Sequence, residues 1–596
     1  MEARNLVDML LATVKRSGNN TALMKKQNGR YDGITYLEFS DQIRNVALGL
    51  SRIGIRHGDR IALLSENRPE WPIADFGILS VGAINVPLYT TLTPAQIKYI
   101  LEDSGTRVII VSTSDLFEKV QSLFEQLPAL EKIITIEPVK ISDNSVMTMT
   151  NLCDLGKEIY IEHPEFYQQM VDNVLSDDLC GIIYTSGTTG APKGVMLSHG
   201  NILSNVIAGL QVLRVNEEDT LLSFLPLSHS FERMAGQFCA ICAGATIAYA
   251  ESIETIAQNF GEVCPTVVAT VPRVLEKVYT RVIEQAEAGS AIKRKIFWWA
   301  VKIGEKYVRA RKSGRISALL NWQYFIATHL VFQKLKNRLG GRMRFFASGG
   351  APLPKDIGEF FYRAGILILE GYGLTETSPV ITVNHEDAFK FGAVGKIIPG
   401  VEAMIANDGE ILTRGPHVMK GYYQNPEATL ETIDSDGWLH TGDIGYFDEE
   451  GFLHITDRKK NIIVTSGGKN VTPSAIESKL VSSPYIEQVM VVGDARNYLT
   501  ALIVPNFDTL EKYAHDNGLI FNSRDELVSL NKIYQLIEQH VQELLCDFAR
   551  FEQIKKFTLL TREFTLESGE MTPTLKMKRK IIAGNYVQEI NAMYNN

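Results

Sequence analysis

The sequence predicts an α/β protein with a large N-terminal domain of parallel-type sheets and helices, a small β region, and a small α+β C-terminal domain. Its 596 residues are more than one hydrophobic core usually serves, so at least two domains are expected. Between about residues 40 and 270, short apolar runs alternate with helical patterns, which indicates βαβ units with helices on both faces of the sheets. The pattern changes again after "TDRKKN" (456–461), where the smaller unit should start.

Three runs rich in Val, Ile and Leu predict buried parallel strands at 60–65, 83–89 and 106–112. Residues 93–105, "TPAQIKYILEDSG", carry apolar residues at helical spacing after Thr93. Thr is a common N-cap, so this stretch predicts a helix between two of the strands. Strand, helix and strand then follow in the order that a βαβ unit requires.

The pattern of residues in the second half of the chain changes twice. Residues 290–340 are helical and basic, and residues 392–452 hold short β runs between recurring glycines, which predicts hairpins and turns. After residue 461 the chain predicts a strand-rich stretch at 462–471, a helix at 473–481, and strands at 486–494 and 501–506. We therefore expect a large domain over residues 1–457 and a smaller domain over residues 458–596.

Composition excludes several classes of protein. The net charge of −9 is unlike that of a general nucleic-acid binder, which carries a basic excess. Six scattered cysteines suit a reducing compartment, and the "FCAIC" pair, Cys239 and Cys242, has no second pair nearby to complete a zinc site. The start "MEARNLVDML" does not have the pattern of a signal peptide, and the most apolar windows are too short to cross a bilayer. These features predict a cytoplasmic protein.

The stretch "YTSGTTGAPKGV" (184–195) has the residues of a polyphosphate-binding loop. Its glycines let backbone N–H groups approach an anion, its hydroxyls donate hydrogen bonds, and Lys193 supplies a positive charge. It is not a Walker A loop, because Pro192 stands where the second glycine belongs and Gly194 where a magnesium-binding hydroxyl belongs. The spacing also differs from a dinucleotide fingerprint. A surface loop remains the alternative for such a composition.

This stretch resembles the phosphate loop of the adenylate-forming superfamily, which contains acyl-CoA synthetases, peptide synthetase adenylation domains and firefly-type luciferases. The family's other motifs follow in its order: "GYGLTET" (371–377), "GWLHTGDIG" (437–445), "ITDRKKNIIVTSGGKNVTPSAIE" (455–477) and "TPTLKMKRK" (572–580). Five motifs in one order identify the chain as similar to this superfamily. The helical insertion at 290–340, followed by "RMRFFASGGAPL", resembles its long-chain fatty acid–CoA ligase branch.

The resemblance implies a reaction in two halves: a carboxylate and ATP form an acyl-adenylate and pyrophosphate, and a thiol then displaces AMP. The co-substrates implied are ATP, a long-chain fatty acid and coenzyme A, with Mg²⁺ as the metal. The residues implied to bind ATP or AMP are Thr185, Ser186, Gly187, Thr188, Thr189, Gly190, Lys193, Ser348, Gly349, Gly350, Ala351, Gly371, Tyr372, Gly373, Asp443 and Arg458. Of these, Asp443 would hold the ribose hydroxyls and Tyr372 would stack on adenine.

Further roles follow from the same resemblance. Thr375 would contact the α-phosphate, and Glu376 would bind Mg²⁺, a cation that prefers oxygen ligands. Lys576 would bridge the attacking carboxylate and the α-phosphate, although the basic run "KMKRK" also reads as a solvated surface. The resemblance also implies that the C-terminal domain is a mobile lid, with Lys460 as its hinge. Ser466, Gly467 and Gly468 would approach the thiol arm in the second half-reaction.

The identities of the acyl group and of the thiol are predicted from less specific features of the sequence. "FLPLSHSFERM" (224–234) matches the family's acyl-pocket entrance, where His229 is either a gate residue or a satisfied core histidine. The apolar stretch after it lines a tunnel or forms a buried helix and strand. A carrier-protein ligase, which loads an acyl carrier protein, is the alternative within the class. A non-catalytic nucleotide-binding homologue and a luciferase-like oxidase are the alternatives outside it.

The segment 293–315 holds nine Lys or Arg and one acid, Glu305. Ile296, Trp299, Ile303 and Tyr307 fall on one stripe of a helix, a pattern that suits either the protein core or an anionic membrane surface. We therefore expect a helix here and, as one of its two interpretations, peripheral membrane contact. The same basic surface would also suit an acidic carrier protein.

Overall fold

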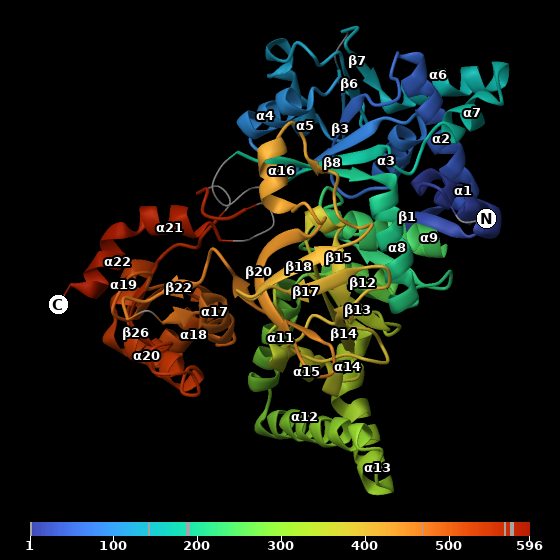
Figure 1. Cartoon of the computed structure of the whole chain (residues 1–596). Coiled ribbons are helices and arrows are strands. Elements are labelled where there is room, and N and C mark those ends of the chain that lie inside the picture. Colours follow the sequence, from blue (N-terminus) through green and yellow to red (C-terminus); the bar gives the residue numbers. More distant parts are fainter. Residues whose placement is uncertain are drawn as a thin grey trace.

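The computed structural model describes residues 3–140, 143–185, 191–467, 469–565, 568–572 and 577–595. Figure 1 shows a large unit, a smaller C-terminal unit at its side, drawn orange to red, and a helical projection that carries α12 (Ala291–Lys312) and α13 (Ala318–Ala327). Within the described residues, no helix is both long and apolar enough to cross a bilayer.

The first large sheet contains the three strands expected at 60–65, 83–89 and 106–112. Its order is β19 (Gly421–Tyr422), β9 (Lys193–Ser198), β8 (Leu179–Thr185), β4 (Ile84–Leu88), β3 (Arg60–Leu64), β5 (Val108–Val111), β6 (Lys132–Thr135) and β7 (Val146–Thr148). The strands from β8 to β7 pair in parallel, and β9 and β19 are added antiparallel. The predicted helix is α4 (Pro94–Ser104), which is capped by Thr93 and ends at the left-handed Gly105.

The second large sheet has the order β16 (Lys396–Ile397), β15 (Val380–Val383), β14 (Leu367–Gly373), β13 (Phe345–Ser348), β12 (Val267–Thr270), β10 (Thr220–Ser223), β11 (Thr246–Tyr249), β1 (Thr21–Gln27) and β2 (Arg30–Thr35). Its strands from β14 to β1 pair in parallel, and antiparallel strands close both ends. The carboxyl ends of β12, β13 and β14 therefore meet along one edge. Ligands usually bind at such an edge in open α/β sheets.

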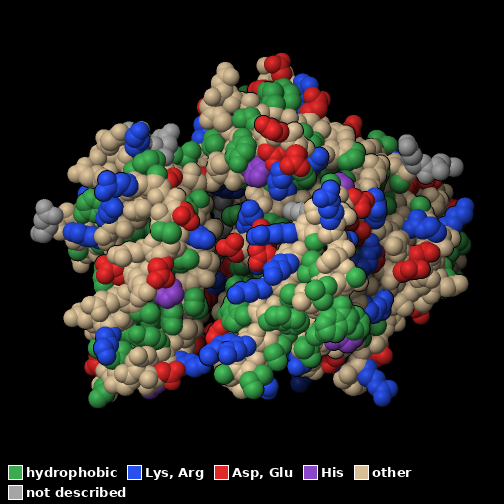
Figure 2. Space-filling view, turned by 90° about the horizontal axis from the view of Figure 1, so that it is seen from below, with side chains coloured by type: hydrophobic (Ala, Val, Ile, Leu, Met, Phe, Trp, Pro, Cys, Tyr) green, Lys and Arg blue, Asp and Glu red, His purple; other side chains and the backbone are tan. Residues whose placement is uncertain are grey.

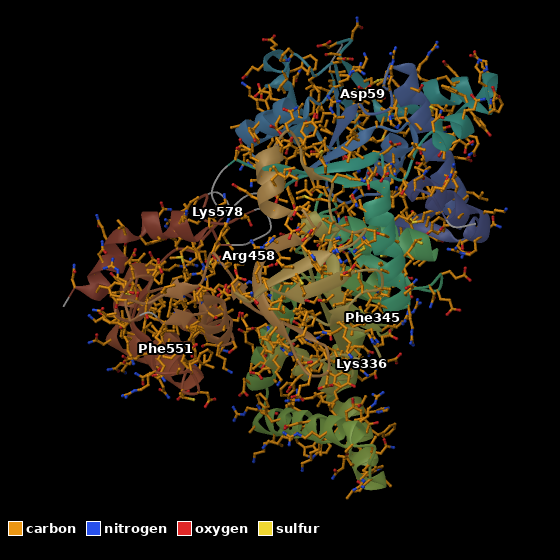
Figure 3. The ribbon with its side chains drawn as sticks, in the orientation of Figure 1. Asp59, Lys336, Phe345, Arg458, Phe551 and Lys578 are labelled. Carbon is orange, nitrogen blue, oxygen red and sulfur yellow. The ribbon has the colours of Figure 1, made fainter. Side chains whose placement is uncertain are left out.

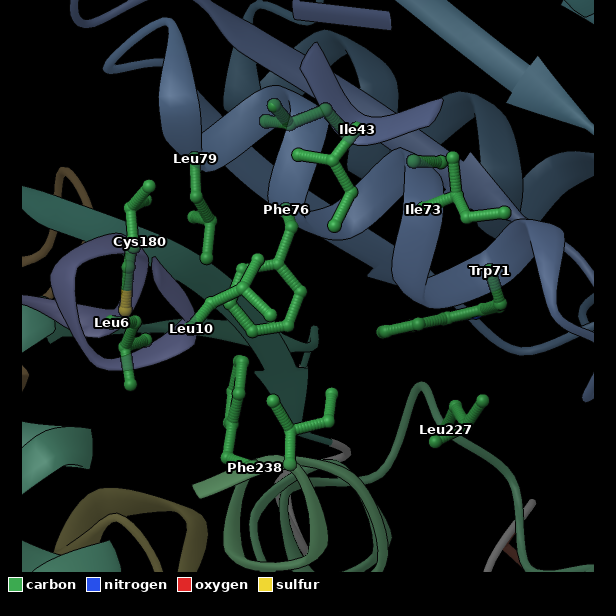
Figure 4. Packing of buried hydrophobic residues seen from close by; sticks show 14 of the residues in the cluster. Leu6, Leu10, Ile43, Trp71, Ile73, Phe76, Leu79, Cys180, Leu227 and Phe238 are labelled. Carbon is green, nitrogen blue, oxygen red and sulfur yellow. The ribbon is translucent and has the colours of Figure 1, made fainter. Parts of the chain in front are cut away.

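The main core lies where helices pack between these two sheets. The helix α3 (Glu70–Ser80) is buried from Trp71 onward, as expected for a helix that is apolar all round. Figure 4 shows Trp71, Phe76 and Phe238 gathered in this core, and the rings of Phe76 and Phe238 meet edge to face with 5.6 Å between centroids. The fold class predicted from the sequence is confirmed by this arrangement.

The helices of the large unit pack in the shared core or on the outer face of one of the two sheets. The shared core contains α1 (Leu6–Ser17), α2 (Tyr36–Arg52), α3, α8 (His199–Leu213), the π-helix η2 (Glu232–Phe238) and α9 (Cys239–Ala243). The outer face of the first sheet carries α4 and α5 (Ser114–Gln121). The outer face of the second sheet carries α10 (Ile256–Val263), α11 (Pro272–Glu287), α12, α14 (Gln333–Arg338) and α15 (Lys355–Arg363). Buried residues of α6 (Met149–Glu162), α7 (Phe166–Asp172) and α16 (Pro426–Thr432) also belong to the shared core.

The expected β region is an antiparallel sheet of β17 (Glu402–Ile405), β18 (Glu410–Arg414), β20 (Leu439–Phe447) and β21 (Leu453–Arg458). The short helix α16 interrupts this region and was not predicted. Cys239 is buried and Cys242 half-buried, so the "CxxC" pair belongs to a packed helix. The stretch after His229 forms η2, α9 and β11, which contribute buried residues to the main core, and its lining of a tunnel stays a prediction.

The C-terminal unit has its own apolar core, made by residues 463–594. Its sheet has the order β24 (Ile486–Val492), β25 (Leu499–Pro505) and β26 (Ile554–Leu559), and a short hairpin joins β22 (Ile463–Val464) to β23 (Asn470–Val471). The unit's helices are α17 (Pro473–Val481), α18 (Phe507–Asp516), α19 (Arg524–Ser529), α20 (Asn531–Leu544), α21 (Arg579–Asn585) and α22 (Val587–Tyr594). The strand-rich stretch expected at 462–471 is only this hairpin, because a turn at Ser466 and Gly467 interrupts it. The domain boundary at residues 457 and 458 stays a prediction.

Candidate functional site

Tyr372, Asp443 and Arg458 meet in a cluster that joins three strands. Tyr372 lies near the end of β14, and Asp443 on β20 stands directly opposite Arg458 on β21. The Tyr372 hydroxyl donates to Asp443 Oδ2 at 2.7 Å, and Arg458 Nε lies 3.1 Å from Asp443 Oδ1. Burial raises the pKa of the Tyr372 phenol well above its usual value, and the Asp443 charge adds to the effect. The phenol therefore stays a hydrogen-bond donor at neutral pH.

Thr375 and Glu376 follow β14 in a single 3-10 turn, η4 (Thr375–Thr377). The hydroxyls of Thr375 and Ser230 lie 3.1 Å apart, and Glu376 Oε1 accepts a hydrogen bond from the Tyr422 hydroxyl at 2.9 Å. The main-chain oxygen of Glu376 accepts from Met419 N at 2.9 Å. Two elements far away in the sequence therefore hold this turn in place.

Lys193 begins β9, and its Nζ lies 4.9 Å from the centroid of the Tyr422 ring, within the range of a cation–π contact. Thr185 ends β8 and pairs in register with Lys193. The cation at one end of the predicted phosphate loop is thus linked to Glu376 through Tyr422. Ser186, Gly187, Thr188, Thr189 and Gly190 lie outside the described residues.

The segment after β13 forms a second wall of the site. Ser348 ends the strand and is buried, and the Phe231 ring packs against Gly349, where a Cβ would lie 3.3 Å from it. Gly350 has a φ of 83°, a conformation that favours glycine. Ala351 is exposed beyond it.

Gly371 and Gly373 flank Tyr372 at the end of β14. At Gly373 a Cβ would lie 1.6 Å from the main-chain oxygen of Pro379. Only glycine therefore fits at this position of the "GYG" motif, since a side chain would push away the antiparallel strand that follows.

His229 lies beside these groups. Its Nδ1 accepts a hydrogen bond from Phe231 N at 3.1 Å, and the neighbouring Ser230 contacts Thr375. The structure therefore brings the predicted entrance segment 224–234 against the predicted phosphate-contacting turn. It places His229 at the site and leaves its role as a gate a prediction.

Asn67 is a site-supporting residue that sequence reasoning missed. Its side-chain nitrogen donates to Leu225 O at 2.6 Å and to Ser223 Oγ at 3.0 Å, while its oxygen accepts from Leu227 N at 3.1 Å. These bonds fix the start of the segment that carries His229. Its position after the parallel strand β3 was the available signal, because polar residues at such strand ends often serve the site.

Two buried carboxyls were also missed. Glu232 begins the π-helix η2, and its Oε1 accepts a hydrogen bond from Ser223 Oγ at 2.6 Å. Burial raises the pKa of Glu232 to about 8. Burial likewise raises the pKa of Glu370 to about 7, and Glu370 accepts from Leu353 N at 3.4 Å, which holds the segment after β13.

A fully buried ion pair anchors the same π-helix. Arg233 donates to Asp75 through Nη2 at 2.5 Å and Nε at 3.0 Å, and Gln237 donates to Asp75 Oδ2 at 2.8 Å. Asn85 adds a donor to Asp75 Oδ1 at 2.7 Å. Removing one member of a buried pair costs about 3–5 kcal/mol, so this network sets the position of η2 firmly.

The C-terminal unit is docked beside the site. Figure 3 shows Arg458 where the chain passes from the large unit to this unit, two residues before Lys460. Ser466 is held by Asn497, with 2.7 Å between Oγ and Oδ1, and Gly467 is exposed. An ion pair between Arg273 of α11 and Glu487 of β24 joins the two units. Gly468 and Lys576 lie outside the described residues.

Among the described residues, no three His, Cys, Asp or Glu side chains gather closely enough to hold a metal ion by themselves. Glu376 is half-buried, and one carboxylate oxygen is occupied by Tyr422. One carboxylate fits Mg²⁺, which in nucleotide sites takes most of its ligands from phosphate oxygens and water.

The chain matches two family models in succession. Residues 10–423 match the model described as AMP-binding enzyme, and residues 460–596 match the model described as AMP-binding enzyme C-terminal domain. The long-chain-fatty-acid–CoA ligase FadD15 of Mycobacterium tuberculosis is 37% identical over 572 residues, which cover 95% of this chain and 93% of that protein. The long-chain-fatty-acid–CoA ligase ACSBG2 of Xenopus laevis is 32% identical and matches over 98% of this chain and 82% of its own length.

Solved structures share the fold over nearly the whole chain. The anthranilate CoA ligase AuaEII in complex with anthranoyl-AMP superposes with a TM-score of 0.75 at 21% identity and covers 99% of both chains. The ATP-bound MatB of Rhodopseudomonas palustris gives a TM-score of 0.70 at 23% identity, over 98% of this chain and 99% of its own.

Proposed function

Because the chain belongs to the AMP-binding enzyme family, we propose that it performs the reaction for which its relatives are named, the ATP-dependent joining of a long-chain fatty acid to coenzyme A. First, a carboxylate oxygen of the fatty acid attacks the α-phosphorus of ATP, and the bond to pyrophosphate breaks. The thiol sulfur then loses its proton and attacks the acyl carbonyl, and AMP leaves. Neither half needs a bond to the protein, so positioning and electrostatic stabilisation supply the catalysis.

The strongest support for the proposal comes from the residues assigned to the nucleoside part of ATP. Asp443 offers two oxygens to the two ribose hydroxyls, and the buried Tyr372 offers a flat ring for adenine. In the present state both oxygens have partners, Tyr372 and Arg458. The Arg458 side chain is 42% exposed, so it can turn aside or share Asp443 when a ribose binds. Gly349 and Gly350 would form the opposite wall of the pocket.

The phosphate end is assigned to Lys193, Thr375 and Glu376. The contacts Lys193–Tyr422 and Tyr422–Glu376 bring these groups together from two motifs. We assign Mg²⁺ to Glu376, where it would neutralise phosphate charge. Thr375 would donate to an α-phosphate oxygen and thus favour the charge that builds up there during the attack. Ser186, Thr188 and Thr189 would bind the outer phosphates, as their motif predicts.

The C-terminal unit would act as the lid. Lys460 is the proposed hinge, since it lies in the short turn between β21 and the separate core of this unit. Lys576 would contact the fatty acid carboxylate and the α-phosphate in the first half-reaction. Ser466, Gly467 and Gly468 would line the approach of the thiol in the second.

The thiol acceptor and a contact with membranes are two further proposals. Coenzyme A is the proposed acceptor, and an acyl carrier protein is the alternative that the experiment below tests. We also propose that the basic segment 293–315 contacts a membrane surface, because Lys293, Arg294, Lys295, Lys302 and Lys306 of α12 are all exposed.

Product analysis by mass spectrometry tests the proposed function. The purified protein receives ATP, Mg²⁺ and fatty acids of graded length, with coenzyme A in one tube and holo acyl carrier protein in another. Long-chain acyl-CoA in the first tube alone is the expected result. Product on the carrier protein alone would move the assignment to the alternative acceptor. Absence of acyl-adenylate, AMP and thioester from both tubes would refute the ligase assignment.

A further inference from the structure

The helix α13 and the turn after it present an apolar face to solvent at the end of the helical projection in Figure 1. Leu319, Trp322, Phe325 and Leu330 are 64%, 61%, 59% and 50% exposed. Residues 316–330 contain no Lys, Arg, Asp or Glu. Side chains three residues apart share one face of a helix, so Leu319, Trp322 and Phe325 form a continuous stripe.

The opposite face of α13 is packed, so the exposure is not that of an unfolded segment. The rings of Tyr324 on α13 and Tyr307 on α12 stack with 3.9 Å between centroids, and the Tyr324 hydroxyl donates to Arg363 O at 3.2 Å. Ala327 is fully buried. The hydroxyl of Ser317 caps the helix by accepting from Leu320 N. A rigid platform therefore holds the apolar stripe outward.

The apolar stripe expected on α12 does not serve this purpose. Ile303 is buried and Ile296 and Tyr307 are half-buried, so this side of α12 faces the core or α13, and only Trp299 of the four is exposed, at 36%. The exposed apolar residues lie mainly beyond the segment 293–315. The contribution of α12 to the outer surface is Ile292, Trp298, Trp299 and its basic side chains.

The charged side chains near this stripe in the sequence are almost all positive. Residues 291–338 hold twelve Lys or Arg and a single acid, Glu305, while the whole chain has a net charge of −9. Figure 2, which views the molecule from the end where α12 and α13 project, shows Lys and Arg side chains in rows beside a group of hydrophobic side chains. The positive charge is therefore local to this projection.

We infer that α13 inserts its apolar stripe into the interfacial layer of an anionic phospholipid membrane, while Lys and Arg of α12 contact the headgroups. This inference deepens the proposed membrane contact by naming the inserted element, and it rests on that contact. A helix with a Trp-containing apolar face beside abundant basic residues lies in the plane of such a membrane. A second copy of this chain would bring an equally basic face against the first, which disfavours a symmetric dimer through this surface.

Vesicle binding by the full chain tests the inference. The wild type is sedimented with vesicles of phosphatidylcholine alone and of phosphatidylcholine mixed with phosphatidylglycerol. The test variant replaces Leu319, Trp322 and Phe325 with Ser. The matched control replaces Ile161, Ile253 and Ile520 with Ser, which are 79%, 74% and 87% exposed elsewhere on the chain.

We expect the wild type to bind the anionic vesicles, the test variant to lose about tenfold or more in affinity, and the control to bind like the wild type. A Trp322→Phe variant should bind but lose part of the blue shift in fluorescence that insertion produces. Lys302→Gln with Lys306→Gln should weaken binding about fivefold per charge at low salt.

Three outcomes would overturn the inference: no binding by the wild type, equal binding by the test variant, or equal binding to both kinds of vesicle. Light scattering adds a fourth, in which the wild type self-associates and the test variant does not. Acyl-adenylate formation on a water-soluble, short-chain acid is measured in parallel. Since vesicle binding does not depend on that activity, failure of the ligase assignment and failure of the insertion remain distinguishable.

Discussion

Replacing Glu232 with Gln tests the protonation of a carboxyl next to the site. Glu232 is 1% exposed, and burial raises its pKa from an ordinary 4.5 to about 8. Between these values the folded protein holds a proton that the unfolded chain releases. The free energy of unfolding therefore falls as pH rises, by about 1.4 kcal/mol per pH unit and by about 5 kcal/mol at most over the whole interval.

Gln has nearly the same shape as the protonated Glu and can still accept from Ser223, but it does not titrate. The stabilising contribution of the neutral Glu is fully present below pH 4.5 and is lost as pH rises through about 8. The variant lacks this loss. We therefore expect Glu232→Gln to gain stability relative to the wild type as pH rises, by roughly 1.4 kcal/mol per unit between about pH 5 and 7.

Urea unfolding followed by fluorescence at several pH values measures this difference. Only the difference between the two proteins is diagnostic, because His199 titrates in the opposite sense: burial lowers its pKa to about 4, so it favours the folded state as pH rises toward 6.5. An exposed carboxylate changed to amide, Glu125→Gln, is the control. Parallel stability curves for wild type and Glu232→Gln would refute the reasoning.

Three other predictions concern the nucleotide, the docking of the two units and the lid. Asp443→Asn should weaken AMP binding about tenfold or more, since hydrogen bonds to charged groups contribute about 1.5–3 kcal/mol, and calorimetry that gives an unchanged affinity would remove Asp443 from the ribose. Arg273→Gln breaks the partly exposed pair with Glu487, which contributes about 1 kcal/mol or less. The variant should be cleaved by protease around Lys460 a few-fold faster than the wild type, and added salt should have the same effect on the wild type. Equal cleavage rates in the wild type and the variant would argue that the pair does not hold the units together. Lys576→Ala should abolish most adenylate formation while conversion of preformed acyl-adenylate to thioester continues, and equal loss in both half-reactions would contradict its assigned role.

The sequence predicts those parts of the fold that depend on neighbours along the chain. The strands β3, β4 and β5 are short apolar runs because both faces of a parallel sheet are covered. The helix α4 is predicted from a local cap, Thr93, and its end at Gly105 is a left-handed residue. The cluster of Tyr372, Asp443 and Arg458 was found through three motifs, although nothing in the motifs themselves gives the distances between them.

The rest depends on which side chains the tertiary structure buries. In the sequence Glu232 and Glu370 look like any other glutamate, and only the packing around η2 and β14 raises the pKa of these two carboxyls. Asn67 is one polar residue among several in its loop until Ser223 and Leu225 are placed against it. The sequence likewise does not predict that the apolar stripe of α13 is exposed, because an apolar helix next to a basic one is expected to be buried until its neighbours are known.

The last strand of the large unit, β21, contacts both the proposed ribose site and the C-terminal unit. Asp457 and Arg458 are neighbours on β21, and as side chains of a strand they point to opposite faces. Arg458 contacts Asp443 at the proposed ribose site, and Asp457 accepts from the hydroxyl of Ser474 on α17 at 3.0 Å. Rotation about the proposed hinge at Lys460 must therefore break the Asp457 contact as well as the pair between Arg273 and Glu487. One strand thus faces the proposed ribose site on one side and the docked C-terminal unit on the other, so the proposed AMP departure and lid movement would act on adjacent residues.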